Sequence, residues 1–233
     1  MIGTFGLNTC ADTTNCLTQK LDFYIIDREH GRASLTEAGS LLAATHNECE
    51  RFIRVSACDR VEIQRVLELK PDGILVPQIG SLEEARNAVS WSYFPPTGTR
   101  GISPYTRGFN FIHHDLESKK QQLNAELMLG LLIEGQSGFD ALDDIIETLG
   151  SHIHMLYFGL FDFANSKQVE ASWSNDEIFA ALQNMVRKAK KAGVAIGTIA
   201  RSKDELSLLK QAGVTYIVYL NDLGILYEAM GDF

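Results

Sequence analysis

Short apolar runs alternate along the chain with longer segments in which apolar residues recur at helical spacing. The runs are rich in β-branched and aromatic residues, which is typical of strands buried in a parallel sheet. The pattern predicts eight strands, at residues 4–7, 23–26, 52–55, 73–76, 128–133, 155–159, 194–199 and 216–220. Helix-like segments separate these strands, which is the arrangement of consecutive βαβ units.

Helix boundaries support this interpretation. Residues 81–91 begin with Ser-Leu-Glu-Glu, in which the serine is a favourable N-cap. Residues 175–192 and 203–212 each end just before a glycine, the residue that most often closes a helix. A chain of 233 residues has about the length at which eight strand-helix units close into one barrel. We therefore predict an α/β protein, a single-domain (β/α)8 TIM barrel over residues 1–233.

Composition narrows the classes of function. Apolar residues make up 45% of the chain and charged residues 22%, as in a globular domain with a sizeable core. The net charge of -9 would repel nucleic acid, whose binding depends on Lys and Arg contacts. No apolar run approaches the ~18 residues of a membrane span. We expect a cytoplasmic protein that binds neither nucleic acid nor membranes and keeps its four cysteines reduced.

One connection, residues 93–114, is longer than an ordinary barrel loop and rich in Pro, Gly, Thr and Arg. Long loops on a barrel usually form part of its active site, so we expect this one near the mouth. Arg100 and Arg107 in the loop either meet an anionic substrate or pair with acids on the surface.

Catalytic residues are expected at the carboxyl ends of the strands, where the active site of a barrel lies. Polar side chains there are Asp27, Glu29, His30, Arg54, Gln78, Glu134 and Asp162. Glu134 and Asp162 follow neighbouring strands, so their carboxylates could share one Mg2+ or Mn2+ ion. The alternative is that Asp162 caps a helix and Glu134 is solvated.

The sequence leaves two interpretations open for each of two further side chains, Arg54 and His30. Arg54 lies inside a predicted strand and must meet a partner, either a neighbouring carboxylate or an oxyanion that develops during catalysis. His30 could act as a general base, because the pKa of an unperturbed histidine lies near neutral pH, although a histidine at a strand end is often structural. The pair His152 and His154 precedes a strand and so falls at the non-catalytic end.

Six fragments carry a resemblance to a known family. They are Asp-Arg-Glu-His-Gly (27–31), Phe-Ile-Arg-Val (52–55), Gly-Ile-Leu-Val-Pro-Gln (73–78), Tyr-Phe-Pro-Pro-Thr-Gly-Thr-Arg-Gly (93–101), Ile-Glu (133–134) and Phe-Gly-Leu-Phe-Asp (158–162). In order and spacing they resemble the HpcH/HpaI aldolase and citrate lyase family over almost the whole chain, and within it the 4-hydroxy-2-oxoheptanedioate aldolases. The resemblance implies a class II pyruvate aldolase that uses Mg2+, Mn2+ or Co2+ to cleave or form a 4-hydroxy-2-oxo acid. It also implies a homo-oligomer, often a hexamer, with a 2-oxo acid and an aldehyde as small-molecule partners.

The resemblance assigns roles to individual residues. His30 falls on the family's catalytic base and Arg54 on its transition-state stabiliser. Glu134 and Asp162 fall on the metal ligands. Glu68 falls where the family has an aspartate that raises the basicity of the histidine, and its extra methylene is a departure from that pattern.

Substrate contacts show the main departures from the family. The backbone of Phe161 and Asp162 falls on the site that holds the substrate carboxylate. Leu132 stands where the aldolases usually have a substrate-binding glutamine, and Phe163 and Ala164 are expected beside the site. Leucine cannot donate a hydrogen bond to the oxo acid, so we expect weak pyruvate binding or a donor with an apolar substituent. A CoA-thioester lyase, a citrate-type synthase and a non-catalytic small-molecule-binding barrel are the alternatives.

Overall fold

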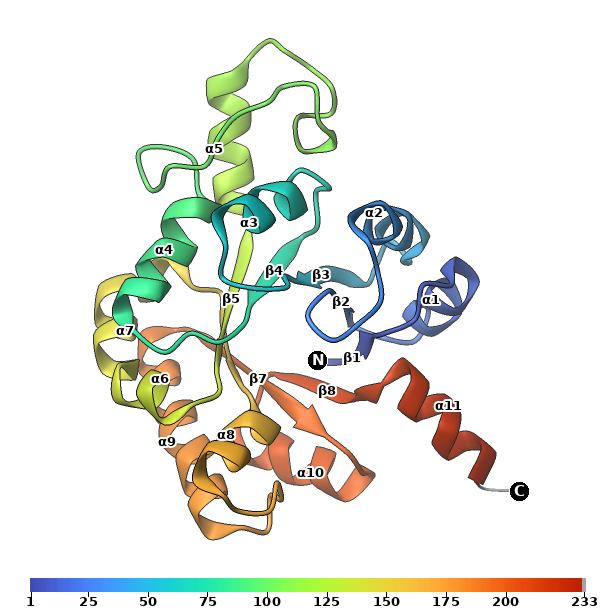
Figure 1. Cartoon of the computed structure of the whole chain (residues 1–233), viewed down its shortest axis with the longest axis vertical. Helices are drawn as coiled ribbons and strands as arrows, with labels where there is room; N and C mark the ends of the chain where they lie inside the picture. The colour runs from blue at the N-terminus through green and yellow to red at the C-terminus, as the bar shows by residue number, and fades with distance from the viewer. Residues whose placement is uncertain (232–233) are drawn as a thin grey trace.

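The computed structural model describes residues 1–231 and forms one closed barrel of eight parallel strands in chain order (Figure 1). The strands are β1 (Ile2–Gly6), β2 (Phe23–Asp27), β3 (Glu50–Arg54), β4 (Gly73–Val76), β5 (Met128–Ile133), β6 (Met155–Phe158), β7 (Ala195–Ala200) and β8 (Tyr216–Asn221). All eight predicted strands are confirmed, each within two residues at its ends. The predicted (β/α)8 architecture is therefore confirmed.

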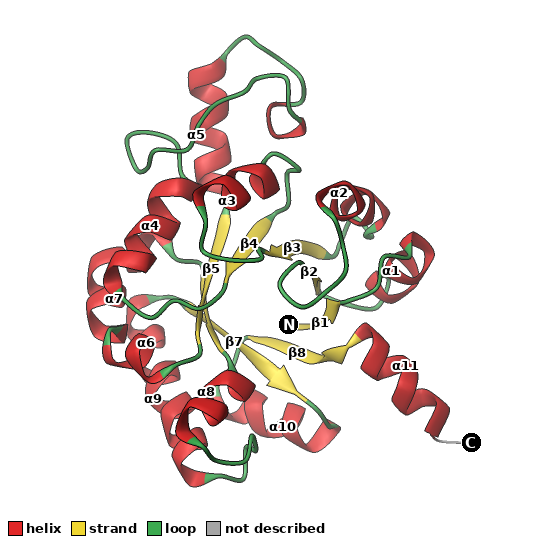
Figure 2. Ribbon diagram, viewed as in Figure 1, coloured by secondary structure: helices red, strands yellow, loops and turns green. Residues whose placement is uncertain are grey.

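Helices surround the strands, as Figure 2 shows by colour. They are α1 (Ala11–Thr18), α2 (Leu35–Ala44), α3 (Arg60–Leu67), α4 (Leu82–Ser92), α5 (Leu116–Glu126), α6 (Gln136–Asp140), α7 (Leu142–Leu149), α8 (Leu160–Lys167), α9 (Asp176–Ala192), α10 (Lys203–Ala212) and α11 (Asp222–Gly231), with 3-10 turns η1 (Arg107–Phe109) and η2 (Gly150–His152). The predicted helix caps are confirmed. The Ser81 hydroxyl accepts from the backbone N–H of Glu84, and Gly193 and Gly213 close α9 and α10 in the left-handed conformation.

The two largest clusters of buried apolar side chains form two layers. The larger layer fills the space between the strands and the helices, and the smaller one fills the interior of the barrel. Near the amino ends of the strands, Phe23, Phe52 and Tyr216 pack edge to face with ring centroids 5.1 to 6.4 Å apart. These rings fill the amino end of the barrel interior.

The long connection at residues 93–115 contradicts one expectation. It leaves the end of α4 and leads through α5 to the start of β5, whereas active-site loops leave the ends of strands. None of its residues is among those that line the cavity at the carboxyl ends. In Figure 1 the connection and α5 project beyond the ring of helices. The loop was placed at the mouth from its length and composition, which do not tell an αβ connection from a βα connection.

The last helix also departs from the ring. α11 runs outward from β8 toward the end of the chain in Figure 1. It exposes Leu223, Leu226, Tyr227 and Met230, and the Tyr227 side chain is 83% exposed. No helix within residues 1–231 is both long and apolar enough to cross a membrane.

Candidate active site at the carboxyl ends of the strands

A cavity of about 330 Å³ lies at the carboxyl ends of the strands. Its lining residues are Phe5, Leu7, Asp27, His30, Arg54, Leu132, Glu134, Tyr157, Gly159, Leu160, Phe161, Asp162, Ile199, Leu220 and Asn221. His30, Arg54, Glu134 and Asp162 were predicted to converge here from four different strand ends. The cavity brings them together, with apolar side chains filling much of the remaining wall.

Arg54 is held by two carboxylates. Arg54 ends β3, and its Cα lies opposite that of Asp27, the last residue of β2. Its Nε and Nη2 donate to Oδ1 and Oδ2 of Asp27 at 2.9 and 2.7 Å, and Nη1 lies 2.9 Å from Oε2 of Glu29. Burial opposes the charge of Arg54, but these partners raise its pKa above the ordinary value. The carboxylate pairing left open by the sequence is therefore present, and the guanidinium still lines the cavity.

Asp27 also shapes the turn that carries His30. Its Oδ1 accepts from the backbone N–H groups of Glu29 and His30 at 3.0 and 3.3 Å. The imidazole of His30 is 65% exposed, and the nearest carboxylate oxygen, Oε2 of Glu29, lies 3.9 Å from Nε2. The backbone is thus fixed while the ring faces the cavity with nitrogen atoms that a substrate can reach.

Glu134 follows β5 and is buried, with 8% of its surface exposed. Its Oε1 accepts from the backbone N–H of Gln78 at 2.7 Å, and the Gln78 side chain donates to Oε1 of Glu29 at 3.0 Å. A Cβ at Gly159 would lie 2.8 Å from Oε2 of Glu134, so only glycine leaves room for this carboxylate. Burial raises the pKa of Glu134 to about 7, with the nearby charges of Glu29 and Asp162 adding to the increase.

Asp162 lies in the first turn of α8, directly after β6. Gly159 holds the N-cap position, and no side chain caps the helix. The alternative in which Asp162 caps a helix and Glu134 is solvated is therefore wrong. Phe161 is half exposed and lines the cavity beside Asp162.

Phe163 and Ala164 do not lie beside the site. Both are buried in α8 and belong to the layer between strands and helices. The Phe163 ring packs on Phe139 and Phe158, with centroids 4.6 and 5.1 Å away. Helical geometry explains the difference, because residues 161 and 162 face the cavity while the next two positions turn toward the core.

Glu134 and Asp162 are the residues that could hold a divalent cation. Within residues 1–231, no group of three or more His, Cys, Asp or Glu residues is arranged to bind a metal. Two carboxylates leave the other positions of a hard cation to water and substrate oxygens. Burial and the neighbouring carboxylates raise the pKa of Glu134, and a cation at this point would offset that cost. The donor set fits Mg2+ or Mn2+.

Leu132 and Tyr157 line the cavity together. They are Cα partners in the pairing of β5 with β6, and both are buried. Leu132 was expected at this wall, but sequence reasoning missed Tyr157. The signal was present, because alternate residues of a strand face the same side and residues 155 and 157 of β6 both point into the barrel.

Glu68 lies at the other end of the barrel from His30. It is the C-cap residue of α3 and comes before β4, whereas His30 follows β2. Its charge acts instead near Arg100, whose guanidinium stacks on the Phe94 ring and whose pKa burial lowers to about 10. Within one chain Glu68 and His30 are therefore apart, and the role of Glu68 in basicity stays a prediction.

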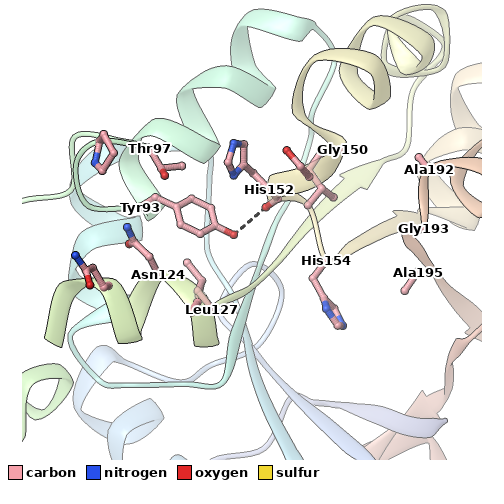
Figure 3. A pocket seen from close by; sticks show the side chains of 15 residues that line it. Tyr93, Thr97, Asn124, Leu127, Gly150, His152, His154, Ala192, Gly193 and Ala195 are labelled. Atoms are coloured by element: carbon pink, nitrogen blue, oxygen red, sulfur yellow. Dashed lines mark hydrogen bonds between the residues drawn. The ribbon is translucent and has the colours of Figure 1, made fainter. Parts of the chain in front are cut away.

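A larger cavity, about 740 Å³, lies at the amino ends of the strands (Figure 3). None of the described residues that line it is charged, apart from the titratable histidines His152 and His154. The Nε2 of His154 lies 2.8 Å from the Tyr216 hydroxyl, so this ring already has a partner. Despite its size, this cavity lacks the carboxylates and the buried cation that the smaller one contains.

Comparison with known proteins matches residues 6–226 to the model of the HpcH/HpaI aldolase/citrate lyase family. The 5-keto-4-deoxy-D-glucarate aldolase of Klebsiella pneumoniae is 27% identical over 209 residues, covering 89% of this chain and 80% of that protein. The hydroxypyruvate/pyruvate aldolase of Sagittula stellata is 27% identical over 218 residues, covering 93% and 85%. An HpcH/HpaI aldolase/citrate lyase family protein from Burkholderia cenocepacia superposes with a TM-score of 0.91 at 24% identity, covering 100% and 92%.

Proposed function

Since the chain belongs to the HpcH/HpaI aldolase/citrate lyase family, we propose that it is a divalent-metal-dependent class II aldolase. Its substrate is a 4-hydroxy-2-oxo acid, which it cleaves to a 2-oxo acid and an aldehyde or forms from them. The observation that carries the proposal is the convergence of His30, Arg54, Glu134 and Asp162 on one cavity. A barrel without chemistry at its mouth has no need to bury charged groups such as Arg54 and Glu134 there.

Each of the four residues has a role in cleavage. Glu134 and Asp162 would hold the metal, which would supply Lewis acidity to the 2-oxo group. His30 removes the proton from the C4 hydroxyl, the C3–C4 bond breaks, and the aldehyde leaves. The electron pair of that bond moves onto the remaining three-carbon unit as an enolate, and Arg54 stabilises its oxygen by hydrogen bonding. Transfer of this proton from His30 to C3 then yields the 2-oxo acid, and condensation follows the same steps in reverse.

Two carboxylates prepare Arg54 for this role. Asp27 and Glu29 fix the guanidinium before substrate arrives, so little reorganisation is needed when negative charge develops. The backbone N–H groups of Phe161 and Asp162, in the first turn of α8, would hold the substrate carboxylate. The similarity to the hydroxypyruvate/pyruvate aldolase of Sagittula stellata supports a 2-oxo acid donor of the pyruvate type.

Self-association is part of the proposal. The apolar side chains of α11 are exposed in a single chain, and a second copy would cover them in a homo-oligomer, with a hexamer as the expected form. Glu68 could act on His30 only from another copy, because the two are apart within one chain. We place the enzyme in the cytoplasm, where the four cysteines, all unpaired in the described residues, would stay reduced.

A first experiment is pyruvate release from oxaloacetate with Mg2+, Mn2+ or Co2+ and after chelation. Loss of CO2 from oxaloacetate leaves the same enolate as aldol cleavage, so the proposed site should catalyse it. We expect metal-dependent release above the rate of metal without protein. Its absence with all three metals would refute the proposal, and faster turnover of citryl- or malyl-CoA than of any oxo acid would replace it with a CoA-thioester lyase.

Glu134→Gln is expected to keep the fold and to weaken Mn2+ binding by at least tenfold, because an anionic ligand becomes a neutral amide of nearly the same volume. Turnover should fall with metal occupancy. Calorimetric titration with Mn2+ measures the first effect, and Glu147→Gln on the outer surface of α7 is the matched control. Equal Mn2+ affinity in wild type and Glu134→Gln would show that Glu134 is not a ligand.

Without metal, the same variant should be more stable than wild type at pH 8. Burial raises the pKa of Glu134 to about 7, above its unfolded value, so the native state pays an increasing cost as pH rises from about 4.5 through 7. Removing the charge should recover about 1–3 kcal/mol of unfolding free energy at pH 8 and almost none at pH 4. Urea unfolding of both proteins in chelator at the two pH values measures this, and a destabilised variant at pH 8 would contradict it.

A further inference from the structure

The hydroxyl of Tyr157 has no hydrogen-bond partner among the described residues, although the residue is only 3% exposed. Buried polar groups are almost always hydrogen-bonded, so an unpaired hydroxyl needs an explanation. Tyr157 belongs to the wall of the cavity that contains Arg54 and Glu134. A missing partner at this point is therefore a feature of the candidate active site and not of the distant core.

The Tyr157 hydroxyl is close enough to the proposed catalytic groups for their charges to act on it. The charges of Arg54, Glu134 and Asp27 all act on it, and burial raises the pKa of Tyr157, so the hydroxyl stays protonated and available as a donor. Neither carboxylate accepts a hydrogen bond from it, and the guanidinium of Arg54 donates none to it. The hydroxyl is thus a buried, unpaired donor of a residue that lines the same cavity as Arg54, where the 2-oxo acid must lie.

The ring that carries the hydroxyl is fixed in place. It packs edge to face on Phe5, with centroids 5.9 Å apart, and it lies against Gly197, its Cα partner on β7. A Cβ at Gly197 would approach Cδ2 of Tyr157 to 2.6 Å, so glycine at this position gives the ring its space. A rigid ring of this kind can present a donor with little loss of conformational entropy.

The neighbour of Tyr157 on β5 is Leu132, which stands where the resemblance places a substrate-binding glutamine. Leucine cannot donate a hydrogen bond, but the tyrosine beside it can. We propose that Tyr157 is a substrate-binding residue whose hydroxyl donates a hydrogen bond to an oxygen of the bound 2-oxo acid, in place of a side chain at position 132. This inference rests on the proposed function, and it replaces the expectation that Leu132 leaves pyruvate weakly bound.

Tyr157→Phe removes the hydroxyl and leaves the ring. We expect the Kd of the Mn2+-loaded protein for pyruvate to rise about tenfold, which corresponds to about 1.4 kcal/mol. Thermal stability without ligand should stay the same or increase, because the variant removes an unpaired buried polar group. The measurements are calorimetric titration with pyruvate and thermal unfolding of the free protein.

Leu132→Gln added to Tyr157→Phe should restore pyruvate affinity to within about threefold of wild type, since a donor returns on the neighbouring strand. In the wild-type background Leu132→Gln should change the affinity much less, so the two substitutions should be strongly non-additive. Additive effects would show that the two positions do not serve the same contact, and they would overturn the proposed replacement.

Tyr93→Phe is the matched control. The Tyr93 hydroxyl donates to the carbonyl oxygen of His152 at 2.8 Å, at the amino ends of the strands (Figure 3). Its removal should lower thermal stability and leave pyruvate affinity unchanged, the reverse of the pattern at Tyr157. If Tyr157→Phe behaves like Tyr93→Phe, its hydroxyl is structural and the inference fails. If wild type itself neither binds pyruvate nor exchanges its methyl protons with any metal, the proposed function fails instead.

Discussion

His30→Ala is expected to lower kcat for aldol cleavage by about 100- to 10,000-fold, the usual contribution of a positioned general base. Thermal stability and Mn2+ affinity should stay at wild-type values. The reason is structural: the His30 imidazole is 65% exposed, while the turn around it is held by backbone hydrogen bonds to Asp27 that the substitution leaves intact. Steady-state kinetics, thermal unfolding and Mn2+ titration together measure these effects.

His114→Ala is the control for this variant. His114 is exposed in the connection before α5 and outside the cavity at the mouth, so its loss should change none of the three quantities. A rate for His30→Ala within a factor of three of wild type would remove His30 from the mechanism. The base would then have to be sought among the other groups of the cavity.

Arg54→Lys should lower kcat by about 100- to 1,000-fold, as the loss of an oxyanion donor does in other enzymes. An ammonium cannot reproduce the planar guanidinium that bonds both oxygens of Asp27 and reaches Glu29 at the same time. The free energy of unfolding should also fall by about 1–3 kcal/mol, because Asp27 is 1% exposed and loses a hydrogen bond. Kinetics below the unfolding transition, with folding checked by circular dichroism, separate the two effects.

Arg51→Lys tests whether the loss of activity is specific. Arg51 lies on the same strand and bonds Asp72 through Nε and Nη2 at 2.8 and 2.6 Å, but it is partly exposed and outside the cavity. It should lose little stability and no activity. If Arg54→Lys loses stability but keeps near-native kcat, then Arg54 serves the fold and does not stabilise the transition state.

The barrel was predictable because the strand signal is strong. Strands buried on both faces are continuous apolar runs, and caps such as Ser81 and Gly193 mark helix ends in the sequence itself. The site was largely predictable for a related reason. Once strand ends are known, parallel topology places His30, Arg54 and Glu134 at one mouth whatever their separation along the chain.

The predictions that proved wrong depended on which end of the barrel a loop joins and on which way a side chain points. Residues 93–115 have the composition of an active-site loop but follow a helix, and composition carries no information about which end of the barrel a loop joins. Phe163 was placed beside the site because it is adjacent in sequence to Asp162, yet the helix turns it into the core. Tyr157 was overlooked because an aromatic residue in an apolar strand looks like core, and only its unpaired hydroxyl distinguishes it.

The most direct test of the central claim is exchange of the methyl protons of pyruvate in deuterated water, followed by NMR. Exchange requires the enolate and no aldehyde, so it reports on the metal, His30 and Arg54 without knowledge of the natural acceptor. We predict exchange by wild type with Mg2+ or Mn2+, loss of exchange with chelator, and strongly reduced exchange in Glu134→Gln and His30→Ala. Binding of pyruvate and metal without exchange, for each of Mg2+, Mn2+ and Co2+, would contradict the account and leave a non-catalytic binding barrel.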